Sequence, residues 1–183
     1  MSLSSLRAPE ELKPAPEMLV GRARRFRLPT VSKGDGIKTV REAEEVFTLS
    51  QDQCIELPAI NPRFASKHAK FAFGVSRAHP GSDYSDQLIK LDLGAADEAV
   101  KQGKVADADA KVWYEENCTP GEPIFVPDPE GEDEEDGVLL SVVLDGKKGR
   151  SMLLCLDAKT MLELGRAEMQ TVFPMGFHGM FVQ

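Results

Sequence analysis

Residues 137–158 read GVLLSVVLDGKKGRSMLLCLDA, and this stretch decides the fold class. Two apolar runs flank the dipeptide Asp145-Gly146, which is a turn signal, and the pattern is typical of a β-hairpin. Both runs are almost continuously apolar, whereas a strand with one solvated face alternates between apolar and polar residues. The sequence therefore predicts a hairpin that is buried on both faces.

Short strand-like segments lie on both sides of this hairpin. We expect strands at residues 22–27, in the second half of 37–49, and at 70–76, 87–93, 111–116, 124–126 and 160–169. Residues 94–110 are rich in alanine and charge instead, which predicts a short surface helix between two strands. Many short strands, separated by proline and glycine turns and accompanied by little helix, favour an all-β sandwich, barrel or propeller.

The terminal residues 173–183 read FPMGFHGMFVQ and place one histidine, His178, among apolar residues and glycines. A neutral imidazole is a common ligand of iron and zinc, because it brings no charge into an apolar pocket. Gly176 and Gly179 let the backbone come close to whatever the ring faces. Since a lone histidine in an apolar segment is more often a hydrogen-bonded core residue, this pattern alone leaves both interpretations open.

Two glutamates lie in apolar or proline-rich surroundings. Glu56 sits between Ile55 and Leu57, and its side chain points opposite to theirs if the segment is extended. Glu122 follows a turn in TPGEPIFVPDPE, residues 119–130. Taken alone, both glutamates are interpreted as ordinary strand-end carboxylates that accept hydrogen bonds from backbone N–H groups.

Two charged runs are expected at the surface. RARRFR, residues 22–27, could contact anionic lipid, but a short strand that shows arginines to solvent is the better interpretation. EGEDEED, residues 130–136, is expected to be a solvated loop, because it lacks the regularly spaced ligands of a calcium loop.

The composition limits the class of protein. With 183 residues the chain has the length of a single domain. A net charge of -8 argues against binding of nucleic acid, whose phosphates repel an acidic surface. The cysteines Cys54, Cys118 and Cys155 form no CxxC pair, so we expect a reducing compartment. Neither a signal peptide nor a transmembrane segment is recognisable, and the expected location is cytoplasmic.

Four motifs, taken in chain order, resemble the carotenoid cleavage oxygenase family, which includes retinoid isomerohydrolase and the fungal carotenoid and stilbene dioxygenases. They are IELPAINPRFASKHAKFAFG, PGEPIFVPDPEGEDEEDGVLLSVVLD, LLCLDAKTMLELGRAEM and FPMGFHGMF. They follow one another from about residue 54 to the end of the sequence, with looser similarity from RRFRLP at Arg24. The resemblance implies the C-terminal blades of a seven-bladed β-propeller, incomplete in this chain. Residues 1–20 would be an extended or poorly ordered lead-in, and residues 21–183 the propeller part.

The resemblance also implies a metal site on the propeller axis, where four histidines hold iron(II) and glutamates orient those histidines. His178 matches the last of the four ligands, and Glu56 and Glu122 match two of the orienting glutamates, which would fix the imidazoles of partner ligands. A carboxylate that accepts the second ring N–H of a ligand fixes its tautomer and orientation. The other three ligands have no counterpart here, because His68 and His79 match no ligand position and are expected to be surface histidines.

The implied function is an iron(II) dioxygenase that uses O2 to cleave a C=C bond of a carotenoid, apocarotenoid or stilbene into carbonyl products. This chain would be a C-terminal fragment, inactive alone because one histidine cannot hold iron tightly. A relative that isomerises its substrate or hydrolyses an ester could use the same iron site. The alternative is a truncated, non-catalytic β-rich remnant that binds an apolar ligand or a partner. Peripheral membrane contact through upstream parts stays open.

Overall fold

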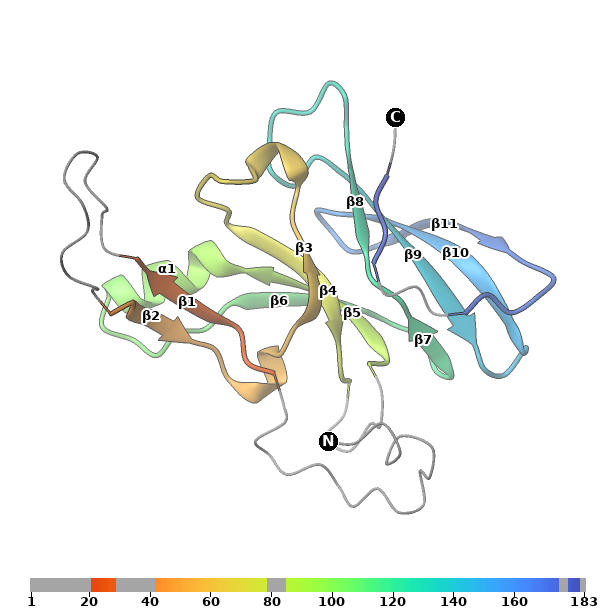
Figure 1. Cartoon of the computed structure of the whole chain (residues 1–183), viewed down its shortest axis with the longest axis horizontal. Coiled ribbons are helices and arrows are strands. Elements are labelled where there is room, and N and C mark those ends of the chain that lie inside the picture. The colour runs from red at the N-terminus through yellow and green to blue at the C-terminus, as the bar shows by residue number, and fades with distance from the viewer. Residues whose placement is uncertain (1–20, 29–41, 79–84, 175–177, 182–183) are drawn as a thin grey trace, which may run out of the picture.

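The computed structural model describes residues 21–28, 42–78, 85–174 and 178–181, so the lead-in 1–20 and His79 lie outside it. In the described part, one α-helix accompanies three antiparallel sheets (Figure 1). A small sheet pairs β1 (Arg24–Arg27) with β2 (Glu44–Thr48). The first meander has the order β3 (Glu56–Ala59), β4 (Phe71–Ser76), β5 (Gln87–Asp92), β6 (Asp109–Tyr114). The second meander has the order β11 (Glu163–Glu168), β10 (Arg150–Asp157), β9 (Gly137–Asp145), with β7 (Cys118–Pro120) and β8 (Ile124–Pro127) both paired to β9.

The helix α1, Leu93–Lys101, follows β5 directly. The side chain of Asp92 accepts a hydrogen bond from the backbone N–H of Ala95 and so caps the first turn. The predicted surface helix is therefore confirmed, although it ends well before residue 110. Strand β7 was not expected, because its sequence Cys-Thr-Pro reads as part of a turn.

Two apolar clusters stabilise the fold. The larger one fills the space between the two meanders, with Phe73 and Leu88 from the first and Phe125 and Leu154 from the second. The smaller one lies on the opposite side of the first meander. It joins residues of β2 and its end, of β5 and of α1, namely Phe47, Leu49, Ile89, Leu91 and Ala96, and also includes Ala108. The first meander is therefore covered on both faces.

The β9–β10 hairpin is present, but the prediction that both of its faces are buried is wrong. Burial alternates along β9, where Leu139 and Val143 are buried and Leu140 and Val142 are only half-buried. The apolar side chains of the run point to both faces of the hairpin, but only one face packs against the core between the meanders. Residues 146–149 form the connection, and Gly149 has φ 62°, so the turn is longer than the dipeptide signal suggests.

The charged runs behave partly as expected. β1 shows Arg24 and Arg27 to solvent, where they pair with glutamates of β2. Arg25 instead pairs with Asp97 and lies over the Phe47 ring. The prediction of a solvated acidic loop at 130–136 is wrong for Glu134, which is buried because it accepts backbone hydrogen bonds from the first meander.

The three cysteines are free. Cys118 is buried in the core between the meanders, and this burial raises the pKa of its thiol to about 11. A thiol with so high a pKa carries little thiolate at neutral pH and is a poor nucleophile or metal ligand. Cys118 is therefore a core residue.

Candidate functional site

Glu122 lies at a break in the first strand of the second meander. β7 and β8 both pair with β9, and residues 121–123 interrupt them. Gly121 keeps the break close to β9, because its N–H donates to Val142 O at 2.9 Å and its carbonyl accepts from Ser141 Oγ at 2.9 Å. Pro123 has no N–H with which to continue the ladder. The side chain of Glu122 is thus presented from an anchored, irregular segment.

Glu56 lies at an irregularity in the first strand of the first meander. Glu56 pairs with Val75 and Ala59 pairs with Phe73. An advance of three residues along β3 therefore corresponds to an advance of two residues along β4, so β3 contains one extra residue. Leu57, within this bulge, has φ 47°. Bulges of this kind redirect side chains and are frequent beside functional sites. The two glutamates therefore occupy corresponding places in the two meanders.

The structure joins His178 to Glu122. Nδ1 of His178 lies 3.2 Å from Oε1 of Glu122, and the N–H of Gly179 donates to Oε2 at 2.9 Å. An ionised carboxylate can only accept, so Nδ1 is the donor of this bond, and in the neutral form of the ring this tautomer has its lone pair on Nε2. The Glu122 side chain is 16% exposed and the imidazole 69% exposed. The carboxylate therefore holds both the ring and the adjacent backbone.

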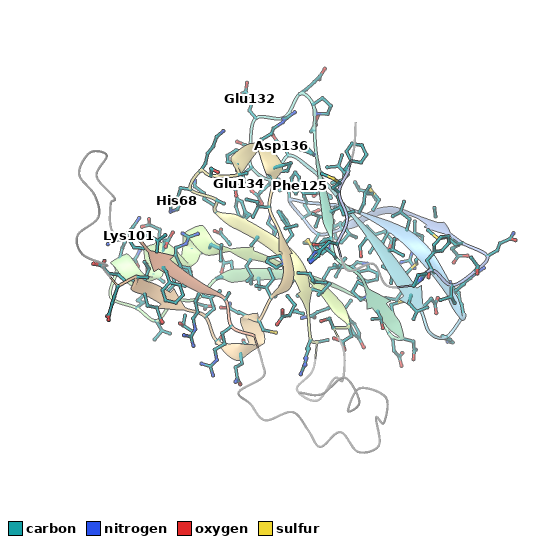
Figure 2. The ribbon with its side chains drawn as sticks, in the orientation of Figure 1. His68, Lys101, Phe125, Glu132, Glu134 and Asp136 are labelled. Carbon is teal, nitrogen blue, oxygen red and sulfur yellow. The ribbon has the colours of Figure 1, made fainter. Side chains whose placement is uncertain are left out.

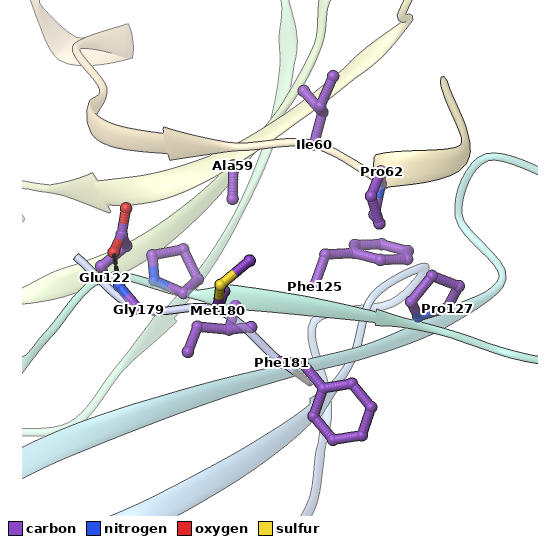
Figure 3. A pocket seen from close by; sticks show the side chains of 11 residues that line it. Ala59, Ile60, Pro62, Glu122, Phe125, Pro127, Gly179, Met180 and Phe181 are labelled. Carbon is purple, nitrogen blue, oxygen red and sulfur yellow. Dashed lines mark hydrogen bonds between the residues drawn. The ribbon is translucent and has the colours of Figure 1, made fainter. Parts of the chain in front are cut away.

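An apolar cleft of about 600 Å³ begins at Glu122 and Gly179, whose hydrogen bond is drawn in Figure 3. One wall comes from the end of β3 and the residues after it, the other from β8, and residues 179–181 border it. Gly179 permits this packing, because a Cβ there would lie 3.0 Å from Ile124 Cδ1. The main apolar side chains that line the cleft are those of Ile60, Pro62, Phe125, Pro127, Met180 and Phe181.

The other candidate residues lie elsewhere. Glu56 is exposed and lies on β3, whereas Glu122 touches His178 itself. His68 is a surface histidine, 70% exposed, whose Nε2 lies 3.3 Å from Asp97 Oδ2. In the described ranges, no three His, Cys, Asp or Glu side chains come together in a group that could hold a metal ion. A neutral imidazole held by a carboxylate fits one ligand position of a metal site, and the described residues supply that single position.

Sequence reasoning missed two features of the site. The N–H of Gly179 was not recognised as a second donor to Glu122, although glycine after the histidine indicated a close approach. The cleft was not expected either. Its one available signal is Pro123 directly after Glu122, because a proline has no N–H to donate and interrupts regular strand pairing.

The two meanders, each carrying a glutamate at an irregularity of its first strand, define blades of a β-propeller with a carboxylate-held imidazole. The chain belongs to the family described as retinal pigment epithelial membrane protein, the carotenoid oxygenases, whose model matches residues 2–183. Similar relatives are the carotenoid dioxygenase of Neurospora crassa, 41% identical over 75% of this chain and 21% of its own length, and the torulene dioxygenase of Fusarium fujikuroi, 36% identical over 85% and 25%. A human relative named mitochondrial carotenoid-cleaving dioxygenase is 39% identical over 73% of this chain and 21% of its own length. The chain thus spans about a quarter or less of these relatives.

Solved structures show the same fold. A chimera titled ACO/RPE65 matches with a TM-score of 0.62 and 23% identity, over 78% of this chain and 27% of the chimera. Cobalt-substituted Synechocystis ACO matches with a TM-score of 0.63 and 21% identity, over 88% and 36%. The predicted fold class, all-β blades of an incomplete propeller, is confirmed. Within the residues that the structure describes, no helix is both long and apolar enough to cross a bilayer.

Proposed function

We propose that this chain contributes one metal ligand and the carboxylate that orients it to an iron(II)-dependent carotenoid-type oxygenase. The observation that carries the proposal is the contact of His178 Nδ1 with Glu122 Oε1 at 3.2 Å. Family membership supports a carotenoid-cleaving oxygenase, because relatives are named carotenoid and torulene dioxygenases. The substrate would be a carotenoid, apocarotenoid or stilbene, cleaved with O2 at a C=C bond into two carbonyl products.

In this proposal His178 binds the metal through Nε2. Glu122 keeps the proton on Nδ1, fixes the plane of the ring and makes Nε2 more basic. The bond from Gly179 N–H to the other carboxylate oxygen, at 2.9 Å, limits rotation of the carboxylate. Bound iron(II) would supply open coordination positions at which O2 is activated.

Glu56 is proposed to orient another ligand imidazole of the same site. Its place at a bulge in β3 corresponds to the place of Glu122 in the second meander. The remaining three histidine ligands are proposed to come from outside these 183 residues. The chain by itself is then expected to bind iron(II) weakly and to be inactive, because affinity arises from several converging ligands.

The first test is metal binding to the purified chain, followed by NMR. Cobalt(II) or iron(II), added without oxygen, should broaden the signals of Gly179 and Ile124, which border the pair. His178→Ala should abolish this broadening, and Glu122→Gln should weaken binding by about tenfold or more, because it removes the orienting charge. His68→Ala is the matched control and should leave binding unchanged. Broadening that survives His178→Ala would show that His178 is not the ligand.

The second candidate function is a non-catalytic remnant that binds an apolar ligand, and the open apolar cleft beside the pair favours it. Metal binding at the pair separates the two candidates, because the remnant is not expected to bind iron(II) or cobalt(II) through His178. Incorporation of labelled O2 into carbonyl products of an apocarotenoid is expected only from a protein that also supplies the other ligands, and its loss in His178→Ala of that protein identifies the oxygenase.

A further inference from the structure

Residues 128–136 form the acidic segment between β8 and β9, which we name the acidic strap. The acidic strap is attached to the first meander at three places. The strap begins next to Pro127, which lines the cleft, and returns to the second meander at Gly137. Figure 2 shows Glu132 at its outer end and Glu134 on the side of the first meander. The strap therefore crosses from the β8 wall of the cleft toward the β3 wall.

The first attachment is the side chain of Glu134, which is 7% exposed. The N–H of Lys70 donates to both of its carboxylate oxygens, at 2.9 and 3.0 Å, and the N–H of Phe71 donates to Oε1 at 3.0 Å. These amides are at the start of β4. Hydrogen bonds to a buried charged group are among the strongest in proteins, and a partner left unpaired by truncation is strongly unfavourable.

The second attachment joins the backbone of the strap to the residues after β3. Asn61, which is fully buried, donates through Nδ2 to Glu134 O at 3.1 Å. Arg63 donates to Gly131 O at 2.8 Å. Asn61 lies between Ile60 and Pro62, which line the cleft. This attachment therefore acts directly on the β3 wall.

The third attachment is the ion pair of Glu135 with Lys90 on β5. Lys90 is 3% exposed, donates to Lys159 O at 3.0 Å, and lies 4.6 Å from the centre of the Phe71 ring. Burial lowers the pKa of Lys90, and the bond to Glu135 counteracts this. The strap is thus fixed to β5, to the start of β4 and to the residues that follow β3.

We infer that the acidic strap is a clamp across the cleft, and that Glu134 is a positioning residue for the pair of Glu122 and His178. By holding the β3 wall against the β8 wall, the strap fixes the segment that presents Glu122, and Glu122 in turn holds His178 and Gly179. The importance of this positioning for catalysis rests on the proposed function. The clamp itself does not depend on any metal.

The test is hydrogen exchange and imidazole ¹⁵N NMR on the metal-free 183-residue chain. In Glu134→Ala, the amides of Lys70 and Phe71 should exchange about tenfold faster or more, because they lose a charged acceptor. If the clamp positions the site, the Gly179 amide should also exchange faster, and the ¹⁵N shifts of His178 should show a mixture of tautomers. Glu122→Gln is the reference variant. It shows how the exchange rate of the Gly179 amide and the ¹⁵N shifts of His178 respond when the carboxylate charge is absent.

Glu132→Ala is the matched control, because Glu132 is an exposed glutamate of the same strap. It should change none of these signals. Glu134→Gln, which keeps one acceptor oxygen, should give an intermediate response and serves if Glu134→Ala does not fold. Faster exchange at Lys70 with unchanged Gly179 and His178 signals would overturn the inference, and so would equal acceleration at Val143 in the β9–β10 hairpin. Since no metal is present, these outcomes are independent of the iron-binding test.

Discussion

The two meanders have the same antiparallel course but differ in how they are buried. β4 and β5 of the first meander are buried along almost their whole length, because the core between the meanders covers one face and the β2–α1 cluster covers the other. β9 and β10 of the second meander carry more continuous apolar sequence, yet only one face is fully buried. The difference shows that burial of a strand depends on the elements packed against it, beyond its own apolar content.

The largest expected effect comes from removing equivalent leucines from the two meanders. Leu91→Ala empties a fully buried position in the β2–α1 cluster and should destabilise the chain by about 2–5 kcal/mol. Leu140→Ala removes the same atoms from the half-buried face of β9 and should cost about 1 kcal/mol, since less apolar surface is lost from the interior. Urea unfolding measures both. An equal loss of unfolding free energy in the two variants would show that the second meander is covered on both faces.

This comparison also separates what the sequence predicts from what it does not. The hairpin at 137–158 follows from local pattern, but a continuous apolar run cannot tell which face meets a core. The β4 and β5 segments, whose sequences FAFGVS and QLIKLD include polar residues, are the ones buried on both faces. Glu134 was misassigned for a similar reason, because its acceptor role depends on the backbone of Lys70 and Phe71, far away in the sequence.

The next largest loss of stability is expected from a substitution opposite the bulge that carries Glu56. A Cβ on Gly74 of β4 would lie 2.4 Å from Ile55 Cγ1 and 2.6 Å from Glu56 O, and the second of these atoms is backbone. Gly74→Ala should therefore displace β3 and destabilise the chain by about 1–3 kcal/mol. Gly165→Ala in β11 is the control, because a Cβ there meets nothing within 4 Å, and it should leave stability nearly unchanged. If both variants unfold at the same urea concentration, β3 does not require the glycine opposite its bulge.

The site could be predicted only in part, because its contacts also join residues that are far apart in the sequence. His178, Glu56 and Glu122 were identified as candidates from motifs, and their proposed roles stay predictions. The contact between His178 and Glu122 joins residues 56 positions apart, and no local pattern indicates it. The resemblance suggested that both glutamates orient other imidazoles, whereas the structure places Glu122 against His178 itself.

The smallest effect tests a polar link between the outer edges of the meanders. Arg166 on β11 donates to Glu115, which follows β6, at 2.6 Å, and to Glu163 Oε1 at 2.6 Å. Because all three side chains are partly exposed, Arg166→Met should cost only about 0.2–1 kcal/mol at pH 7. Lys101→Met, which breaks an exposed pair with Glu98 within α1, links no meanders and should change stability even less.

The pH dependence of the Arg166 effect identifies its cause. The hydrogen bond from Arg166 lowers the pKa of Glu163 in the folded chain. A carboxyl whose folded pKa lies below its unfolded value, about 4.3 for glutamate, stabilises the fold above that value and loses this contribution as pH falls through the folded pKa. The difference in unfolding free energy between the unchanged chain and Arg166→Met should therefore shrink below about pH 4. If urea unfolding gives the same difference at pH 7 and at low pH, Arg166 stabilises the edge through its contact with Met152, whose Sδ lies 3.4 Å from Nη1, and charge does not join the two meanders there.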